Sequence, residues 1–343
     1  MLIGMLHNRG DPNKVSRAYL YSAISKIEDA DFFYFTTKSV NFEEKQINGF
    51  YYEKGKWKEK LFPFPDVVIN AANQKTRKQN EVYYKLEKLI PYTSYPVGSK
   101  IFVYNKLLRT TYLKQFLIPF KEIKKINDIL VFLNKYKEII VKPIRGHHGD
   151  NLIKIEKINE KIIVTEKTNI FECNTEELIN YLEKYPKKCL AQKYIKSTLR
   201  TGEPFDYRLH LQKNKNANWQ TTIIIPRIGT KNYVITNISQ GSQMVEFVKF
   251  LKNEYKEKYK EVKEKIETFA LKFVHEFEEQ YPYNFDELGI DIGFDDNRNI
   301  WVYEVNFRPG HIFIEVATAK NAIHYAMFLG NKGRRENEKN ISK

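Results

Sequence analysis

The amino-acid sequence predicts a protein of the α/β (α+β) class that folds as more than one packed unit. Near the N-terminus, apolar runs at 2–6, 32–36 and 64–72 alternate with helical patterns, as in a small domain with a parallel sheet. Residues 205–238 have a pattern of successive strands, and two short strands follow within 289–307. A chain of 343 residues can bury a large core and divide into two or three units.

The elements between these regions are predicted from local patterns. Residues 74–90 have helical spacing, and the Pro-, Gly- and Ser-rich segment 91–100 predicts a connection. Helices are expected at 104–117 and near 126–137, the first opened by Lys106 after a strand-like Ser-Lys-Ile run. The centre of the chain then predicts, in order, a strand at 138–143, a loop at 145–151, strands at 152–158 and 161–166, a helix near 175–184, and a strand or connector at 189–195.

One apolar stripe stands out in the last third of the chain. Its members step by four and three, which predicts a single helix face that serves the core: Tyr255, Tyr259, Val262, Ile266, Phe269, Phe273 and Phe277. A helix near 315–328 and a polar end complete the chain. We therefore expect an N-terminal α/β domain at 1–96, a middle subdomain at 97–195, a C-terminal subdomain at 196–330 and a flexible tail at 331–343.

Composition limits the classes of function. The net charge of +15 comes from 57 basic and 42 acidic residues, but the lysines are interleaved with Glu and no Arg-rich stripe occurs, which argues against specific nucleic-acid binding. No apolar run has the length of a membrane span, and the first six residues predict a buried strand rather than a signal peptide. Cys173 and Cys189 have no metal-like or redox-like spacing, so we expect a soluble protein of the reducing cytosol.

The segment 289–310, GIDIGFDDNRNIWVYEVNFRPG, carries the strongest chemical signal. Folded about its polar turn at 296–299, it predicts a hairpin in which Asp291 faces Glu304, with Asn306 on the same side. Two carboxylates and an amide oxygen are hard ligands suited to Mg²⁺ or Mn²⁺, ions that usually also hold substrate phosphates. The alternative is a solvated hairpin edge with acids placed by chance.

A second signal is the loop RGHHGDN at 145–151, which follows Lys142 at the end of a strand. Its two glycines allow the backbone to approach a phosphate, and the lysine adds a positive charge for the same anion. The spacing does not match a Walker A motif, and an ordinary glycine hairpin is the alternative. His147 and His148 lack a third metal-binding partner and are expected to be loop residues.

Charged residues also occur within the strands that follow. Asp206 and Arg208 alternate on one strand face, as phosphate or metal groups do and as surface ion pairs do more often. Arg227 ends a strongly apolar run, where an arginine needs a partner. That partner is expected to be either a phosphate or carboxylate of a ligand, or a structural acid.

Taken together and in this order, these motifs resemble the ATP-grasp superfamily. Within it, TSYPVGSKIFVYNK, FDYRLHLQK, TNISQG and GIDIGFD with EVNFRPG are similar to the YheC/YheD group of endospore coat-associated proteins. The resemblance covers about residues 64–328 and implies a fold in which two subdomains clasp a nucleotide behind an N-terminal domain. The middle subdomain, 97–195, would then be the lid.

The resemblance implies roles for individual residues. Lys106 and Lys142 would hold the ATP phosphates under the 146–149 loop, and residues 192–195 would be the hinge that receives adenine. The residues expected to bind the nucleotide are Lys106, Lys142, Gly146, His147, Gly149, Gln192, Lys193, Ile195, Asp206 and Arg208. The superfamily often has Glu where this chain has Gln192, so the adenine and ribose contacts are expected to differ.

The same resemblance implies a catalytic end to the site. Asp291, Glu304 and Asn306 would bind one or two Mg²⁺ ions, or Mn²⁺, with Glu304 bridging. Arg227 would face the γ-phosphate, and Arg308 with Gly310 would bind the anionic end of the acceptor substrate at the head of the last helix.

The activity implied is an ATP-dependent carboxylate–amine ligase that works through an acyl phosphate, with an amino acid or peptide as substrate. Two alternatives remain open: an ATP-binding protein of spore-coat assembly that has no turnover, and an ATP-dependent kinase on the same fold. The expected partners are small carboxylate and amine substrates, with no specific nucleic acid and no membrane. The resemblance also allows a homodimer, contacts with spore-coat proteins, and a cytoplasmic or spore-associated location.

Overall fold

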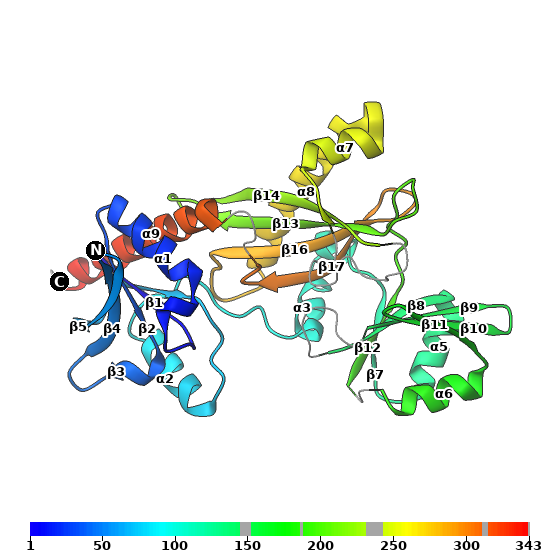
Figure 1. Ribbon diagram of the computed structural model, residues 1–343, viewed down its shortest axis with the longest axis horizontal. Coiled ribbons are helices and arrows are strands. Elements are labelled where there is room, and N and C mark those ends of the chain that lie inside the picture. The colour runs from blue at the N-terminus through cyan, green and yellow to red at the C-terminus, as the bar shows by residue number, and fades with distance from the viewer. Residues whose placement is uncertain (145–151, 186–187, 231–242, 311–314, 342–343) are drawn as a thin grey trace.

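The computed structural model describes residues 1–144, 152–185, 188–230, 243–310 and 315–341, with the side chains described as far as 333. Three sheets follow one another along the long axis of the molecule, each with its own helices (Figure 1). The first lies in the N-terminal part, the second comes from the middle of the chain, and the third lies between them. The predicted ATP-grasp fold class therefore has its three expected sheet-containing parts.

The N-terminal sheet is parallel only at its centre. Strand β1 (Leu2–Leu6) lies between β2 (Asp31–Phe35) and β6 (Val67–Asn70), and both pairings are parallel, as predicted. An antiparallel extension, which the sequence reasoning did not foresee, continues the sheet through β3 (Val40–Asn41), β4 (Gln46–Glu53) and β5 (Lys56–Pro63). The sheet is therefore mixed, and the carboxyl ends of β1 and β6 lie at the same edge.

Helices cover the faces of this sheet. They are α1 (Ser16–Ile27), α2 (Arg77–Glu87) and the C-terminal helix α9 (Glu315–Ile341), with short 3₁₀ turns at η1 (Pro12–Lys14) and η2 (Thr37–Ser39). Helix α9 lies beside α1 (Figure 1), and Ala319, Ala322, Ile323 and Ala326 pack in one core cluster with β1. The last helix thus packs on the N-terminal sheet, although it lies at the other end of the sequence.

The middle sheet has the order β11-β10-β9-β8-β12-β7 and is antiparallel in every pairing that the described residues make. Its own apolar cluster packs against α5 and α6. Segment 189–195, for which strand and connector were both open, forms a strand over 189–193. The elements are β7 (Phe120–Ile123), α5 (Ile126–Tyr136), β8 (Glu138–Pro143), β9 (Ile153–Ile158), β10 (Lys161–Glu166), β11 (Asn169–Cys173), α6 (Thr175–Glu183) and β12 (Cys189–Lys193).

The third sheet has the order β15-β14-β13-β16-β17 and is also antiparallel. The predicted stripe is buried from Val262 to Phe277. Tyr255 falls on a separate helix because the chain turns at Lys256, where φ is +50°. The elements are β13 (Phe205–Lys213), β14 (Trp219–Ile228), β15 (Gln243–Met244), α7 (Phe247–Tyr255), η4 (Lys256–Lys258), α8 (Tyr259–Glu278), β16 (Glu287–Phe294) and β17 (Ile300–Phe307).

The prediction for residues 99–117 was wrong in one respect that matters for the site. Ser99 is the N-cap of α3 (Lys100–Leu107), because its hydroxyl accepts a hydrogen bond from the Phe102 N–H, so 99–101 is not strand-like. A second short helix, α4 (Thr111–Lys114), starts from its own Thr110 cap. Lys106 therefore lies in the last turn of α3 and does not open a helix.

Several expectations have no structural counterpart among the described residues. The 145–151 loop, with Gly146, His147 and Gly149, lies outside them, and so does the strand-like run 233–239.

The tail from 331, expected to fray, continues α9 as far as Ile341, since its Glu, Lys, Arg and Asn residues extend an existing helix without a new nucleation step. None of the described helices is both long and apolar enough to span a bilayer. The subdomain boundaries stay predictions.

Candidate functional site

The β16–β17 hairpin brings the three predicted metal ligands together. Asp291 faces Glu304, and Asn306 faces Gly289 two pairs further along, which confirms the predicted pairing of these residues. A bulge after Asp291 then shifts the pairing by one residue. The Asn306 amide donates a hydrogen bond to Asp291 Oδ2 at 3.3 Å. Opposite positions share a face of the sheet, so the two carboxylates and the amide project to the same side.

Asp291 is also the centre of a buried ion-pair network. Arg208, its cross-strand neighbour on β13, donates from Nε to Oδ1 and from Nη2 to Oδ2, the latter at 2.9 Å. Arg227 reaches Oδ1 from β14 at 3.2 Å. Burial acts against ionisation of Asp291, but the charges of Arg208 and Arg227 outweigh it and hold the pKa of this carboxyl below its usual value. Both oxygens of Asp291 are therefore engaged by arginine.

Arg227 has a second carboxylate partner. It faces Asp206 across the β13–β14 pair and donates to it from Nε at 2.6 Å and from Nη2 at 2.5 Å. Both side chains are buried. Burial disfavours the charge of Arg227, but Asp206 and then Asp291 outweigh that effect and raise its pKa. Arg227 is thus paired with two acids of the chain, and Asp291 joins Arg227, Asp206 and Arg208 to the β16–β17 hairpin.

A hydroxyl that the sequence reasoning missed links the three parts of the site. Tyr104 Oη, from α3, accepts hydrogen bonds from Lys142 Nζ at 3.2 Å and from Gln192 Nε2 at 3.0 Å. It donates in turn to the carbonyl of Tyr303 at 3.0 Å. Burial lowers the pKa of Lys142, and the nearby charges of Glu304 and Asp291 partly offset this. Lys142, Gln192 and the β16–β17 hairpin are thereby brought together.

Lys106, which was assigned to the same phosphates, lies elsewhere. Its ammonium donates to the carbonyl of Gln280 and lies over the rings of Phe102 and Tyr281, at 5.2 and 5.0 Å from their centroids. Lys100, on the same helix, is the lysine near the hairpin, with Nζ 3.4 Å from Glu304 Oε1. Six residues along a helix correspond to 600°, so these two lysines point about 120° apart.

The predicted hinge has its backbone donors partly in use. The Lys193 N–H bonds to the carbonyl of Pro119 at 2.9 Å, and the Tyr194 N–H bonds to that of Glu138 at 3.0 Å. The side chains of Gln192 and Ile195 are buried. The segment is therefore held between neighbouring strands, and Gln192 is turned toward Tyr104.

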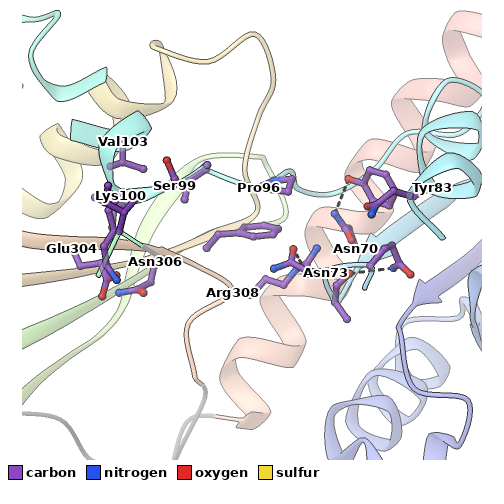
Figure 2. A pocket seen from close by; sticks show the side chains of 18 of the residues that line it. Asn70, Asn73, Tyr83, Pro96, Ser99, Lys100, Val103, Glu304, Asn306 and Arg308 are labelled. Atoms are coloured by element: carbon purple, nitrogen blue, oxygen red, sulfur yellow. Dashed lines mark hydrogen bonds and ion pairs between the residues drawn. The ribbon is translucent and has the colours of Figure 1, made fainter. Parts of the chain in front are cut away.

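A cavity of about 540 Å³ extends from the hairpin to the N-terminal domain. Lys100, Glu304 and Asn306 line one end and Arg308 with Asn73 the other, as Figure 2 shows. The cavity therefore has two distinct ends, one at the β16–β17 hairpin and one at Arg308.

Arg308 is held in place at its end of the cavity. The residue has a positive φ of +55°, and its Nη1 donates to Asn73 Oδ1 at 3.2 Å. Burial lowers the pKa of its guanidinium to about 10, and Asp286 opposes the shift. Its Nε is buried and has no hydrogen-bond partner in the described part of the chain.

A glycine allows this approach. A Cβ at Gly289 would lie 2.6 Å from Cβ of Pro309, so only glycine lets the segment after β17 pack on β16 and direct Arg308 to Asn73. Gly310 follows directly, and 311–314 lie outside the described residues.

The donor set fits a hard divalent cation only in part. Glu304 lies 3.4 Å from a lysine and is more than one-third exposed, and the Asn306 amide oxygen belongs to the same face. Asp291, in contrast, is held by two arginines. No group of three His, Cys, Asp or Glu side chains is arranged for a metal within the described ranges.

Comparison with known proteins agrees with this architecture. The sequence model described as YheC/D like ATP-grasp matches residues 89–329. The endospore coat-associated protein YheD of Bacillus subtilis is 26% identical over 325 residues, which cover 88% of this chain and 71% of that protein.

Two solved structures share the fold at low identity. D-alanyl-alanine synthetase A from Vibrio cholerae is 14% identical, with a TM-score of 0.56 over 98% of this chain and 99% of that one. A peptide-bound ATP-grasp ligase associated with peptide natural products in Chryseobacterium gregarium is 13% identical, with a TM-score of 0.50 over 96% and 97%. The chain belongs to the YheC/D like ATP-grasp family.

Proposed function

We propose that this protein is an ATP-dependent carboxylate–amine ligase that forms an acyl phosphate on an amino-acid or peptide substrate. The observation that carries the proposal is the cavity with two unlike ends. Glu304 and Asn306 beside Lys100 provide the groups for a metal and phosphates, and Arg308 provides a cation for a carboxylate.

The metal end would be formed by Glu304 and Asn306. A bound Mg²⁺ supplies neutralisation of the phosphate charge. Asp291 would join them if an incoming metal displaced Arg208 or Arg227, and the released arginine would then be available to a phosphate oxygen. The network is thus consistent with both of the roles that the sequence left open for Arg227.

The phosphate cations would be Lys142 and Lys100. Tyr104 holds Lys142 in place. Because Lys142 is buried, its charge lacks the stabilisation that water gives an exposed lysine, and a bound anionic phosphate would supply that stabilisation. Lys100 already lies beside Glu304. Lys106 would have to leave the Gln280 carbonyl to take the same part, so we assign its place to Lys100.

The chemistry needs little covalent participation by the protein. A carboxylate oxygen attacks the γ-phosphorus, the bond to the β-phosphate oxygen breaks, and ADP leaves. The amine then attacks the acyl carbon, inorganic phosphate leaves, and the nitrogen loses a proton to give the amide. Arg308 would orient the carboxylate, and the lysines would balance the charge, which are the contributions that phosphoryl transfer requires.

The test is Mg²⁺-dependent ADP release by the purified protein with pooled amino acids and short peptides, compared with Glu304→Ala. The proposal expects substrate-dependent release that the variant lacks, because a metal ligand contributes several kcal/mol of transition-state stabilisation. ADP release by Glu304→Ala at the wild-type rate would overturn it. A phosphorylated product without an amide would identify a kinase instead.

One observation favours a second candidate, an ATP-binding protein without turnover. Asp291 is neutralised by two arginines, an arrangement that is stable without metal. Tight ATP binding with no ADP release in any pool would favour this candidate. In either case, the spore-associated relative leads us to propose a spore-associated role with coat proteins as partners.

A further inference from the structure

A second cleft, of about 430 Å³, lies at the carboxyl end of the N-terminal sheet. His7 follows β1, Lys75 follows β6, and Arg17 lies in the first turn of α1. Strand β1 connects through α1 to β2 on one side, and the chain later returns as β6 on the other side. Such a reversal of strand order opens a crevice outside the strand ends, where open α/β sheets bind their ligands.

The cleft is strongly basic. Arg9, Lys14, Arg17 and Lys75 all line it. Glu287 lies 3.8 Å from Arg17, and Asp11 lies 3.9 Å from Lys14.

Within the described ranges, neither Arg9 nor Lys75 has a carboxylate partner; Arg9 donates instead to the carbonyl of Lys14 at 2.9 Å. Helix α1 starts with no side-chain hydrogen bond at its N-cap, and its dipole adds positive potential.

His7 reports on the same excess of positive charge. Its pKa is lowered to about 4, first by burial and then by the charges of Arg17, Arg9, Arg308 and Lys75. His7 is therefore neutral near pH 7 and adds no charge there. Cations that outnumber the acids in a concave site attract anions and repel one another.

The cleft adjoins the end of the cavity that contains Arg308. Ala72 lines both. The side-chain amide of Asn8 donates to the Asn73 carbonyl at 2.8 Å, and the Asn73 side chain accepts from Arg308. A molecule bound at Arg308 thus lies next to the basic cleft.

We propose that this cleft binds a second oxyanion group, a carboxylate or a phosphate, of the substrate whose reacting carboxylate lies at Arg308. The inference rests on the proposed function for the identity of the reacting group, but the cleft's own binding does not require turnover. The substrate class that follows is an acidic molecule with two or more anionic groups, for which an acidic peptide is the simplest example.

The test is calorimetric binding of triglutamate, inorganic tripolyphosphate and acetate to the full chain at fixed ionic strength. The variant Arg9→Gln/Lys75→Gln removes two exposed cations of the cleft, so the fold should be unaffected. Its control, Arg77→Gln/Lys78→Gln, removes the same charge from an exposed part of α2 outside both hollows.

We expect the cleft variant to bind triglutamate or tripolyphosphate at least about tenfold more weakly than wild type, since each charge-assisted contact is worth more than a neutral one. The control should change affinity by less than about twofold. Loss with triglutamate identifies a carboxylate site and loss with tripolyphosphate a phosphate site. Equal affinities in the two variants, or no binding by wild type beyond that of acetate, would overturn the proposal.

The ligase and the cleft fail in different ways. Anion binding that depends on Arg9 and Lys75, in a protein that never releases ADP, would support the proposed anion cleft and refute the ligase proposal. Substrate-dependent ADP release with the same KM in wild type and the cleft variant would keep the ligase and overturn the cleft's role.

Discussion

Removing the carboxylate of Asp206 tests the buried ion-pair network that joins Asp206 through Arg227 to Asp291 on the β16–β17 hairpin. The substitution Asp206→Asn keeps the shape of the side chain and one acceptor oxygen but removes its charge, so Arg227, 7% exposed in its side chain, keeps Asp291, at 3.2 Å, as its charged partner. Breaking one partner of a buried ion pair costs about 3–5 kcal/mol. Because Asp291 remains as a second partner, we expect the lower end, a loss of about 3 kcal/mol in the free energy of unfolding.

Urea unfolding followed by tryptophan fluorescence measures this loss directly. Trp219 lies on β14, the strand of Arg227, and Trp301 lies on β17, so two of the three tryptophans report on this sheet, while Trp57 lies on β5 of the N-terminal sheet. The control is Glu81→Gln, which breaks the exposed Arg77–Glu81 pair and should cost less than about 0.5 kcal/mol. A midpoint for Asp206→Asn as close to wild type as that of the control would refute the reasoning.

Three further predictions concern the nucleotide end and the N-terminal cleft. Lys142→Ala should weaken ATP binding at least about tenfold in a fluorescent-nucleotide titration, because it removes a charged contact to the phosphates. The urea midpoint should change little, because a buried lysine without a carboxylate in direct contact is costly to keep. Unchanged ATP affinity would count against this role of Lys142. Tyr104→Phe should cost about 1–2 kcal/mol in urea unfolding, since Lys142 and Gln192 both lose their acceptor; no loss would mean that the hydroxyl is not the link. The folded pKa of His7, about 4, lies below its unfolded value, so the unfolded state binds the proton first and stability falls as pH drops from about 6.5 toward 4. His7→Gln should remove roughly 1 kcal/mol of the loss between pH 7 and pH 5, after allowance for partial exposure, and identical pH profiles of wild type and variant would contradict this.

The hairpin itself was predictable, because two short strands around a polar turn are a local pattern. The turn alone does not set the pairing of Asp291 with Glu304, since the pairs next to the turn, such as Ile292 with Val302, lie one residue away from the predicted register. The bulge after Asp291, which was not predicted, shifts the pairing by one residue and brings Asp291 opposite Glu304.

Two misses had signals in the sequence. The β4–β5 hairpin turns at Lys54 and Gly55, both with positive φ, and a glycine at the second turn position between strands that carry aromatic residues is a hairpin signal. Ser99 was a readable helix cap, and it would have put Lys100, rather than Lys106, on the face of α3 that carries Tyr104.

The remaining contacts could not be predicted from local patterns. Arg308 and Asn73 are 235 residues apart, and helix α9 packs on a sheet formed by the first 70 residues. Which acid would pair with Arg227 depended on the strand order β14-β13-β16, which no periodicity specifies. The basic cleft was missed for the same reason, since its lysines and arginines are unremarkable in a chain of charge +15.

The most direct test of the ligase proposal follows oxygen from the substrate carboxylate. Amino acids and short peptides labelled with ¹⁸O in their carboxylates are incubated with the protein, ATP and Mg²⁺, and the inorganic phosphate is analysed by mass spectrometry. An acyl phosphate requires one ¹⁸O atom to pass into each phosphate released, and Glu304→Ala should abolish this transfer. Phosphate released without ¹⁸O would contradict the account.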